Sequence, residues 1–262
     1  MSLFPREHGA YGQITFPLLT SVAVAGISAS ALLIALAAIA GFLAHEPLLV
    51  LVGRRGVQAR EALGKRAATW LATTTVAAIA AGIGGAWSMV PGARWSLALP
   101  LLPALILVAA IPAKREKSSP GEIAVALAFS FLAVPVCLAA GVPVRTAFSV
   151  GVTFALIFVA GTLAVRVVIL GVRGGGDPQA VRATRMTTLI LTSVGSVLLV
   201  IAASRMWLPW ITMVAAAPGL TAAGWLALFP PPAARLRTVG WTLVATSAIA
   251  AVTLAAGLAA AS

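Results

Sequence analysis

The sequence predicts an all-α membrane protein of nine transmembrane helices with its N-terminus inside. Hydrophobic residues make up 61% of its 262 residues and charged residues 9%, whereas roughly a quarter of an average soluble domain is charged. Apolar runs close to the length that crosses about 30 Å of hydrocarbon recur from end to end and leave no room for a soluble domain. Basic residues cluster in alternate loops, as expected of a multi-pass protein. We therefore expect a single polytopic domain over residues 1–262.

Charges, prolines and glycines mark the ends of the predicted spans. The first span is short, and little beyond Gly26 to Ser30 separates it from the second. The basic loop after the second span ends at Arg66, and the prolines at 230–232 end the eighth span because proline cannot continue a helix. Glu7 and His8 ahead of the first apolar run, and the second run directly after it, argue against a cleaved signal peptide. The spans cover residues 10–26, 29–52, 67–90, 95–112, 121–140, 144–170, 186–204, 207–229 and 239–260.

Nine spans place the two termini on opposite sides and divide the loops into two sets. The set that includes the N-terminus carries 14 of the 18 basic residues, whereas the other set carries Arg94, Arg145 and Arg205. By the positive-inside rule, this distribution predicts a cytosolic N-terminus and an outer C-terminus. The tryptophans that then lie at the outer interface, as in an aromatic belt, are Trp87, Trp95, Trp207 and Trp210. The net charge of +12 thus indicates topology first and phosphate binding second, and we expect anionic lipid headgroups but no nucleic acid as partners.

His45 and Glu46 are the strongest candidates for functional residues. They precede Pro47 within the second predicted span, and Glu46 lies about 12 Å inside the level of Arg54 at 1.5 Å per residue. An ionised carboxylate at that depth would be costly if it faced lipid, so we expect it to face protein, water or a ligand. The alternative is an internal ion pair in which Arg166 neutralises Glu46.

Glu7 and His8 form a second candidate pair at the start of the first span. Gly9 and Gly12 follow them and allow the backbone to approach another helix or a ligand closely. We predict that this pair and the second-span pair supply the acid, base or ligand groups of a site. The alternative is an ordinary helix cap, with Glu7 near the positive end of the helix dipole. The spacing of these groups is not a recognised metal-ligand pattern, so we predict no metal site, and the sequence does not identify a cofactor.

Four arginines are candidates for binding an anion: Arg54, Arg55, Arg166 and Arg173. Arg166 and Arg173 are seven residues apart and share a helix face, so Arg166 would extend a basic lining inward from the cytosolic mouth. The surrounding loops suit phosphate or anionic lipid headgroups. The alternative is that these charges only orient the protein in the membrane.

A weak internal repeat bears on the architecture. Residues 163–175 align with residues 44–56, so that Arg173 falls under Arg54, and residues 121–141 align with residues 6–26. The first four helices would then repeat as helices five to eight in the same orientation, and the ninth would be an addition. This predicts a 4+4+1 parallel repeat. The identities are few in an alanine-rich sequence, so a chance similarity remains the alternative.

Two segments resemble the YwiC-like family of bacterial membrane proteins: PREHGAYGQITFPLL at residues 5–19 and FLAHEPLLVLVGRRG at residues 42–56. That family begins with a Pro, Glu-His-Gly-Ala, aromatic-Gly pattern, in which Tyr11 occupies the aromatic position here. It also carries a His-Glu-Pro or Arg-Glu-Pro step in its second helix. The resemblance implies a multi-pass protein of the bacterial cytoplasmic membrane, and it implies no particular activity.

The wider architecture is similar to the UbiA superfamily of prenyltransferases, which have nine helices and polar motifs after helices two and six. Those enzymes use aspartate-rich motifs in these two loops to hold magnesium and a prenyl diphosphate. In this sequence the first loop has Arg54, Arg55 and Glu61 but no aspartate, and the second has only Asp177. Because magnesium requires carboxylate ligands, the resemblance implies a fold and an isoprenoid-type ligand rather than the standard diphosphate chemistry.

Our leading hypothesis is a UbiA-like intramembrane pocket, open to the cytosol, that binds a membrane lipid or isoprenoid-type substrate. Whether the protein is an enzyme, for example a UbiA-like transferase, stays open. One alternative is a small-molecule or proton-coupled transporter whose repeated halves rock about a central site. The other is a non-catalytic membrane assembly protein.

Overall fold

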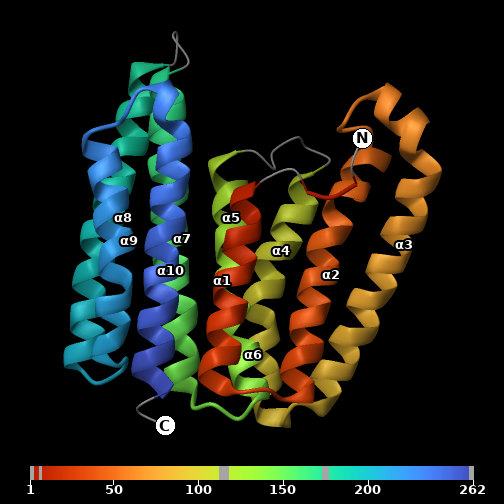
Figure 1. Cartoon of the computed structure of the whole chain (residues 1–262), viewed down its shortest axis with the longest axis horizontal. Helices are drawn as coiled ribbons and strands as arrows, with labels where there is room; N and C mark the ends of the chain where they lie inside the picture. The colour runs from red at the N-terminus through yellow and green to blue at the C-terminus, as the bar shows by residue number, and fades with distance from the viewer. Residues whose placement is uncertain (1–2, 6–7, 112–117, 173–176, 260–262) are drawn as a thin grey trace.

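The computed structural model describes residues 3–5, 8–111, 118–172 and 177–259, and these residues form helices and short connections with no strand. Successive long helices run in alternating directions, with the N-terminus and C-terminus at opposite ends of the bundle (Figure 1). The α-helices are α1 (His8–Ala25), α2 (Ala29–Leu51), α3 (Val57–Ser88), α4 (Ala98–Ala110), α5 (Ser119–Phe131), α6 (Ala133–Ala139), α7 (Val144–Val172), α8 (Pro178–Ser204), α9 (Trp210–Leu228) and α10 (Leu236–Ala259). Two short 3-10 helices, η1 (Pro91–Leu97) and η2 (Ala233–Arg235), precede α4 and α10.

Within the described ranges, 8 helical segments are long and apolar enough to cross a membrane, which confirms a multi-pass helical protein. These segments correspond to the second to ninth predicted spans. α1 is not among them, because its 18 residues include the polar His8 and Gln13. It nevertheless lies inside the bundle against α5, α6 and α10. The count of nine spans therefore stays a prediction that depends on α1.

Two of the predicted boundaries are wrong because charged segments continue helices. α3 begins at Val57 rather than at residue 67, so the basic segment that we expected to be a loop forms its first turns. α8 begins at Pro178 rather than at residue 186, and the Asp177 carboxylate caps it by accepting a hydrogen bond from the Gln179 N–H at 2.9 Å. Hydropathy cannot detect such polar extensions beyond the hydrocarbon layer.

The fifth predicted span is broken into α5 and α6. The break falls at Leu132, three residues before Pro135. Proline lacks an N–H and its ring crowds the preceding turn, so the carbonyl of Phe131 loses its helical donor and the helix is interrupted here. Short α6 then packs on α1, α2 and α7 near the end of the bundle where α7 begins.

α7 is the central helix. In its most apolar stretch 61% of the residues are buried in the bundle, whereas in that of peripheral α3 only 11% are buried. α7 packs against α1, α5, α6, α8, α9 and α10, and Phe154 lies fully inside the core. α3 packs mainly on α2, where a Cβ at Gly85 would lie only 2.8 Å from Ile34 Cγ1. The outer face of α3 exposes Ile79, Ile83 and Trp87, as expected of a surface that contacts lipid.

The helices form two lobes, α1 to α6 and α7 to α10 (Figure 1). We call the end of the bundle where α1 and α3 begin the basic end, because its described loops and adjoining helix turns carry Arg54, Arg55, Arg182, Arg185 and Arg237. The opposite end carries Arg94, Arg145 and Arg205. The proposed repeat makes the α4–α5 contact equivalent to the α9–α10 contact, and both pairs pack together. It also makes the α2–α4 contact equivalent to the α7–α9 contact, but α7 packs closely on α9 whereas α2 makes little contact with α4. The 4+4+1 repeat therefore stays a prediction.

Candidate functional site

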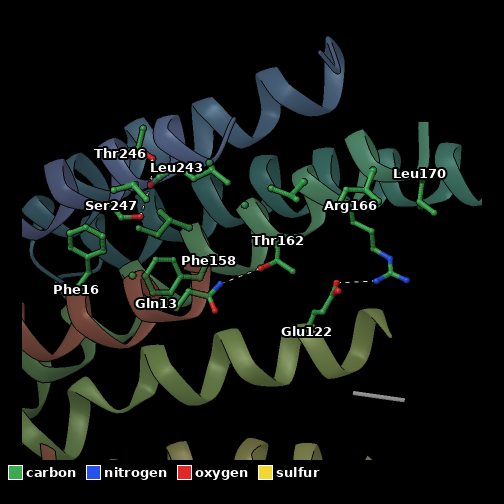
Figure 2. Close-up of a pocket in the computed structure, with 18 residues that line it drawn as sticks. Gln13, Phe16, Glu122, Phe158, Thr162, Arg166, Leu170, Leu243, Thr246 and Ser247 are labelled. Atoms are coloured by element: carbon green, nitrogen blue, oxygen red, sulfur yellow. Dashed lines mark hydrogen bonds and ion pairs between the residues drawn. The ribbon is translucent and has the colours of Figure 1, made fainter. Parts of the chain in front are cut away.

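A cavity of about 530 Å³ lies between the two lobes (Figure 2). Its walls come from α1 and α5 on one side and from α7 and α10 on the other. Gly9, Gly12 and Gly161 leave room for it, and a Cβ at Gly161 would already lie 3.3 Å from Leu243. A concave, mostly apolar site with a few polar groups is the usual form of a small-molecule pocket.

The mouth of the cavity carries one cation and one anion. Arg166 on α7 donates from its NH1 group to Glu122 Oε2 on α5 at 2.9 Å (Figure 2). The Arg166 side chain is 26% exposed and that of Glu122 is 38% exposed, so both are accessible. Glu122 lies in the first turn of α5, where the helix dipole favours a negative charge. The pair therefore closes one side of the pocket at the basic end without sealing it.

A second polar layer lies one helical turn deeper. Thr162 precedes Arg166 by four residues, so both side chains project from the same face of α7. Gln13 on α1 donates from Nε2 to Thr162 Oγ1 over 3.5 Å, a long hydrogen bond across the cavity. Deeper than this layer, near Phe16, the hydroxyls of Thr246 and Ser247 on α10 donate to the carbonyl of Leu243 at 3.1 and 2.7 Å (Figure 2).

Apolar side chains line the rest of the cavity. Phe16 on α1 and Phe158 on α7 approach from different walls, and Leu243 lies on α10 (Figure 2). Ile157 and Val244 extend this surface. The cavity thus has a charged pair at Arg166 and Glu122, polar Gln13 and Thr162 one turn deeper, and a mostly apolar remainder, in which Leu170 lies on the outer side of Arg166 (Figure 2). This combination of charged, polar and apolar walls suits an amphipathic ligand.

Glu46 belongs to a separate polar cluster at the end of α2. Its carboxylate is 1% exposed and forms a two-point ion pair with Arg55, with Nε to Oε1 at 2.8 Å and NH2 to Oε2 at 2.6 Å. Arg55 can reach back because α2 ends in a Schellman turn, in which Gly53 has φ +75° and the Arg54 N–H bonds the Leu49 carbonyl.

The N-terminal segment covers the same end of α2 and α3. Leu3 is buried in a small apolar cluster with Val50 and Ala67, and Phe4 contacts Trp70 edge to face with ring centroids 5.8 Å apart. The Tyr11 hydroxyl donates to the Pro5 carbonyl at 3.0 Å and so ties this segment to α1. Residues 3–5 therefore hold α1, α2 and α3 together at this end of the bundle.

Of the predicted site residues, Arg166 lines the cavity. The described residues that line the cavity do not include four other candidates: His45, Glu46, Arg54 and Arg55. These four lie together at the end of α2 and in the following turn. The alternative in which Arg166 neutralises Glu46 is wrong in its partner, because Glu46 forms an ion pair with Arg55 and Arg166 forms one with Glu122. The remaining candidates are Glu7, His8 and Arg173. Glu7, Arg173 and the side chain of His8 lie outside the described part of the chain.

Sequence reasoning missed Gln13 and Thr162 as members of the site. Gln13 was detectable as the one amide side chain in the first predicted span. Thr162 gave no signal, because threonine in a membrane helix commonly bonds its own backbone. Glu122 could have been suspected because the proposed repeat aligns it with Glu7.

Comparison with known proteins gives one match. A family model described as YwiC-like protein matches residues 4–137. The match covers α1 to α5 and most of α6, and thus Gln13, Glu122 and the Glu46–Arg55 pair, whereas α7 and α10 lie beyond it. No curated protein matches the chain. No solved structure matches it either.

Proposed function

Since this chain belongs to the YwiC-like family and folds as a bundle of apolar helices, we propose that it binds a membrane lipid or isoprenoid-type ligand in the cavity between α1, α5, α7 and α10. The observation that carries the proposal is the gradient along that cavity. Arg166 and Glu122 lie at its mouth, and Phe16, Phe158 and Leu243 line its apolar part. An amphipathic molecule placed along this gradient buries its hydrocarbon and keeps its polar group near water.

The proposal includes a location and an orientation. The protein lies in the bacterial cytoplasmic membrane with the basic end in the cytosol, as the positive-inside rule favours, and with α1 as a ninth span. Anionic headgroups of the surrounding bilayer neutralise the basic loops. The ligand enters at the cytosolic leaflet, because the mouth is at the basic end.

A UbiA-like arrangement is part of the proposal, without the diphosphate chemistry of that superfamily. Within the described residues no group of three His, Cys, Asp or Glu side chains could hold a metal ion. The polar set of the site is Arg166 and Glu122, joined by Glu7 and His8, which directly precede the pocket-lining Gly9 in sequence. We assign Glu46 and Arg55 to the stability of the α2–α3 hairpin rather than to the ligand.

Lipid retained by the purified protein tests the proposal. The wild type, Gly161→Leu and Arg205→Gln would be purified in the same mild detergent, and bound lipid would be counted by native mass spectrometry. Gly161→Leu fills the cavity next to Leu243, so we expect it to lose bound lipid. Arg205→Gln removes an exposed charge at the opposite end and should retain it. Equal retention by all three proteins would refute the site.

The position of the cavity between two lobes also favours a second candidate, a transporter that opens alternately on either side. In that case the protein would move a solute into vesicles, and Arg166→Gln would abolish the movement. A purified protein that binds lipid but moves no solute would support the lipid-binding function instead.

A further inference from the structure

The two polar layers of the cavity restrict the class of ligand, provided that the proposed lipid-binding function holds. We infer that the site takes a zwitterionic glycerophospholipid, whose headgroup carries a phosphate and a primary amine and whose chains are joined through ester carbonyls. The inference rests on the charges at the mouth and on the donors one turn below them. A prenyl diphosphate matches neither layer.

The mouth presents a cation and an anion that already satisfy each other. Arg166 donates to Glu122 at 2.9 Å, and both side chains are accessible. A purely anionic headgroup that binds Arg166 is brought close to the Glu122 carboxylate, a like charge that accepts from the same guanidinium at 2.9 Å. A zwitterionic headgroup instead exchanges partners: its phosphate accepts from Arg166 and its ammonium donates to Glu122. Each charge thus keeps an opposite partner, and the charge-assisted hydrogen bonds are retained.

The deeper layer offers donors where the ester carbonyls of such a lipid would lie. Thr162 is four residues from Arg166, which corresponds to about 6 Å at 1.5 Å per residue. In a glycerophospholipid, the short glycerol unit separates the phosphate from the ester carbonyls by a comparable length. In a prenyl diphosphate this depth holds only hydrocarbon. Burying hydrocarbon against Gln13 and Thr162 would leave polar groups without partners, and that is unfavourable.

Gln13 and Thr162 have donors to give. Among the interactions of the described residues, the Thr162 hydroxyl accepts from Gln13 and donates to no protein acceptor, whereas the hydroxyls of Thr246 and Ser247 donate to Leu243. Gln13 has two amide hydrogens and directs one of them to Thr162. One hydroxyl hydrogen and one amide hydrogen therefore remain for two ester carbonyls. Beyond this layer, Phe16, Ile157 and Phe158 receive the first part of the acyl chains.

Competition between lipids of defined chemistry tests the inference. The purified wild type would be freed of lipid in detergent and then offered phosphatidylethanolamine, phosphatidylglycerol with the same chains, and geranylgeranyl diphosphate, with binding measured by native mass spectrometry. We expect at least about tenfold preference for phosphatidylethanolamine over phosphatidylglycerol, equivalent to about 1.4 kcal/mol, one charge-assisted hydrogen bond. Water-soluble glycerophosphoethanolamine should compete poorly, because it lacks the chains that the apolar wall binds.

Two variants separate the two layers. Glu122→Gln should abolish the preference over phosphatidylglycerol while phosphatidylglycerol still binds. Gln13→Leu combined with Thr162→Val should weaken both glycerophospholipids but not geranylgeranyl diphosphate. Thr246→Val is the matched control. It also removes a hydroxyl from the cavity, but one whose hydrogen is already donated to the Leu243 carbonyl. Size-exclusion profiles would establish that each variant is folded.

The outcomes distinguish the inference from the function on which it rests. If the wild type binds geranylgeranyl diphosphate or phosphatidylglycerol at least as tightly as phosphatidylethanolamine, the inference is wrong and the lipid-binding function stands. A preference for phosphatidylethanolamine that survives Glu122→Gln also overturns it. If the wild type binds none of the three lipids, the proposed function fails as well.

Discussion

The ion pair between buried Glu46 and Arg55 should make the stability of the protein depend strongly on Arg55, a residue of the turn between α2 and α3. Arg55→Gln removes the guanidinium that donates two hydrogen bonds to the Glu46 carboxylate, whose side chain is 1% exposed. With charge centres about 4 Å apart and an effective dielectric constant of about 20, the lost attraction is about 4 kcal/mol. Removal of one partner of a buried pair typically costs about 3–5 kcal/mol, which agrees with that value.

The converse change should cost less. Glu46→Gln leaves Arg55, whose side chain is 20% exposed and can extend toward water from its turn. We expect a loss of about 2 kcal/mol, the value of a lost charge-assisted hydrogen bond. The double variant Glu46→Gln with Arg55→Gln removes both charges, so it should be more stable than Arg55→Gln alone.

Denaturation in detergent micelles measures these differences. Trp70 lies in the apolar cluster beside the end of α2, so tryptophan fluorescence should report the loss of this region. Glu61→Gln, an exposed acid on α3, is the control and should change stability by less than about 0.5 kcal/mol. If Arg55→Gln is as stable as this control, or if the double variant is the least stable of all, the pair does not stabilise the fold as we argue.

Three further outcomes follow from the packing. Gly85→Ala should destabilise the α2–α3 hairpin by about 1–3 kcal/mol, because the added Cβ would lie 2.8 Å from Ile34 Cγ1. Gly82→Ala should be tolerated, because its Cβ would lie 3.7 Å from Ala37 Cβ. Equal melting temperatures of the two variants in detergent would contradict this. Cys137 is fully buried, so the native protein should not react with maleimide until it is unfolded, and rapid labelling of the folded protein would contradict the packing of α6. Because native Cys137 should not react, single added cysteines can report topology. Arg182→Cys and an added N-terminal cysteine should be labelled only from the cytosolic side, and Arg205→Cys only from the outer side. Labelling of the N-terminal cysteine from the outer side would show that α1 does not cross the membrane.

The sequence allowed the helical class and most spans to be predicted, because length and hydropathy are local properties. The polar starts of α3 and α8 were missed, since Arg60, Lys65 and Arg182 are compatible with either a loop or a helix that leaves the hydrocarbon layer. Tertiary packing decides between those states, and hydropathy does not encode it.

The candidate site was harder to predict because its partners are distant in sequence. Gln13 and Thr162 are 149 positions apart and meet only after α1 and α7 pack across the cavity. The partner of Glu46 is nine residues away, but Arg55 reaches it only through the left-handed turn at Gly53. The glycines on both sides of Arg54 and Arg55 were the available signal, and we interpreted those arginines as ligands for an anion instead.

The central position of α7 has a consequence for biogenesis. Helices α1, α5 and α6 bury their inner faces against α7, which is synthesised after them. During translation the first lobe is therefore inserted before the helix that its inner surface packs against. That surface, which includes the α1 and α5 wall of the cavity, is covered only after α7 leaves the translocon. We expect a truncated chain that ends just before Val144 to be recognised and degraded by membrane proteases, although it contains the whole region matched by the family model.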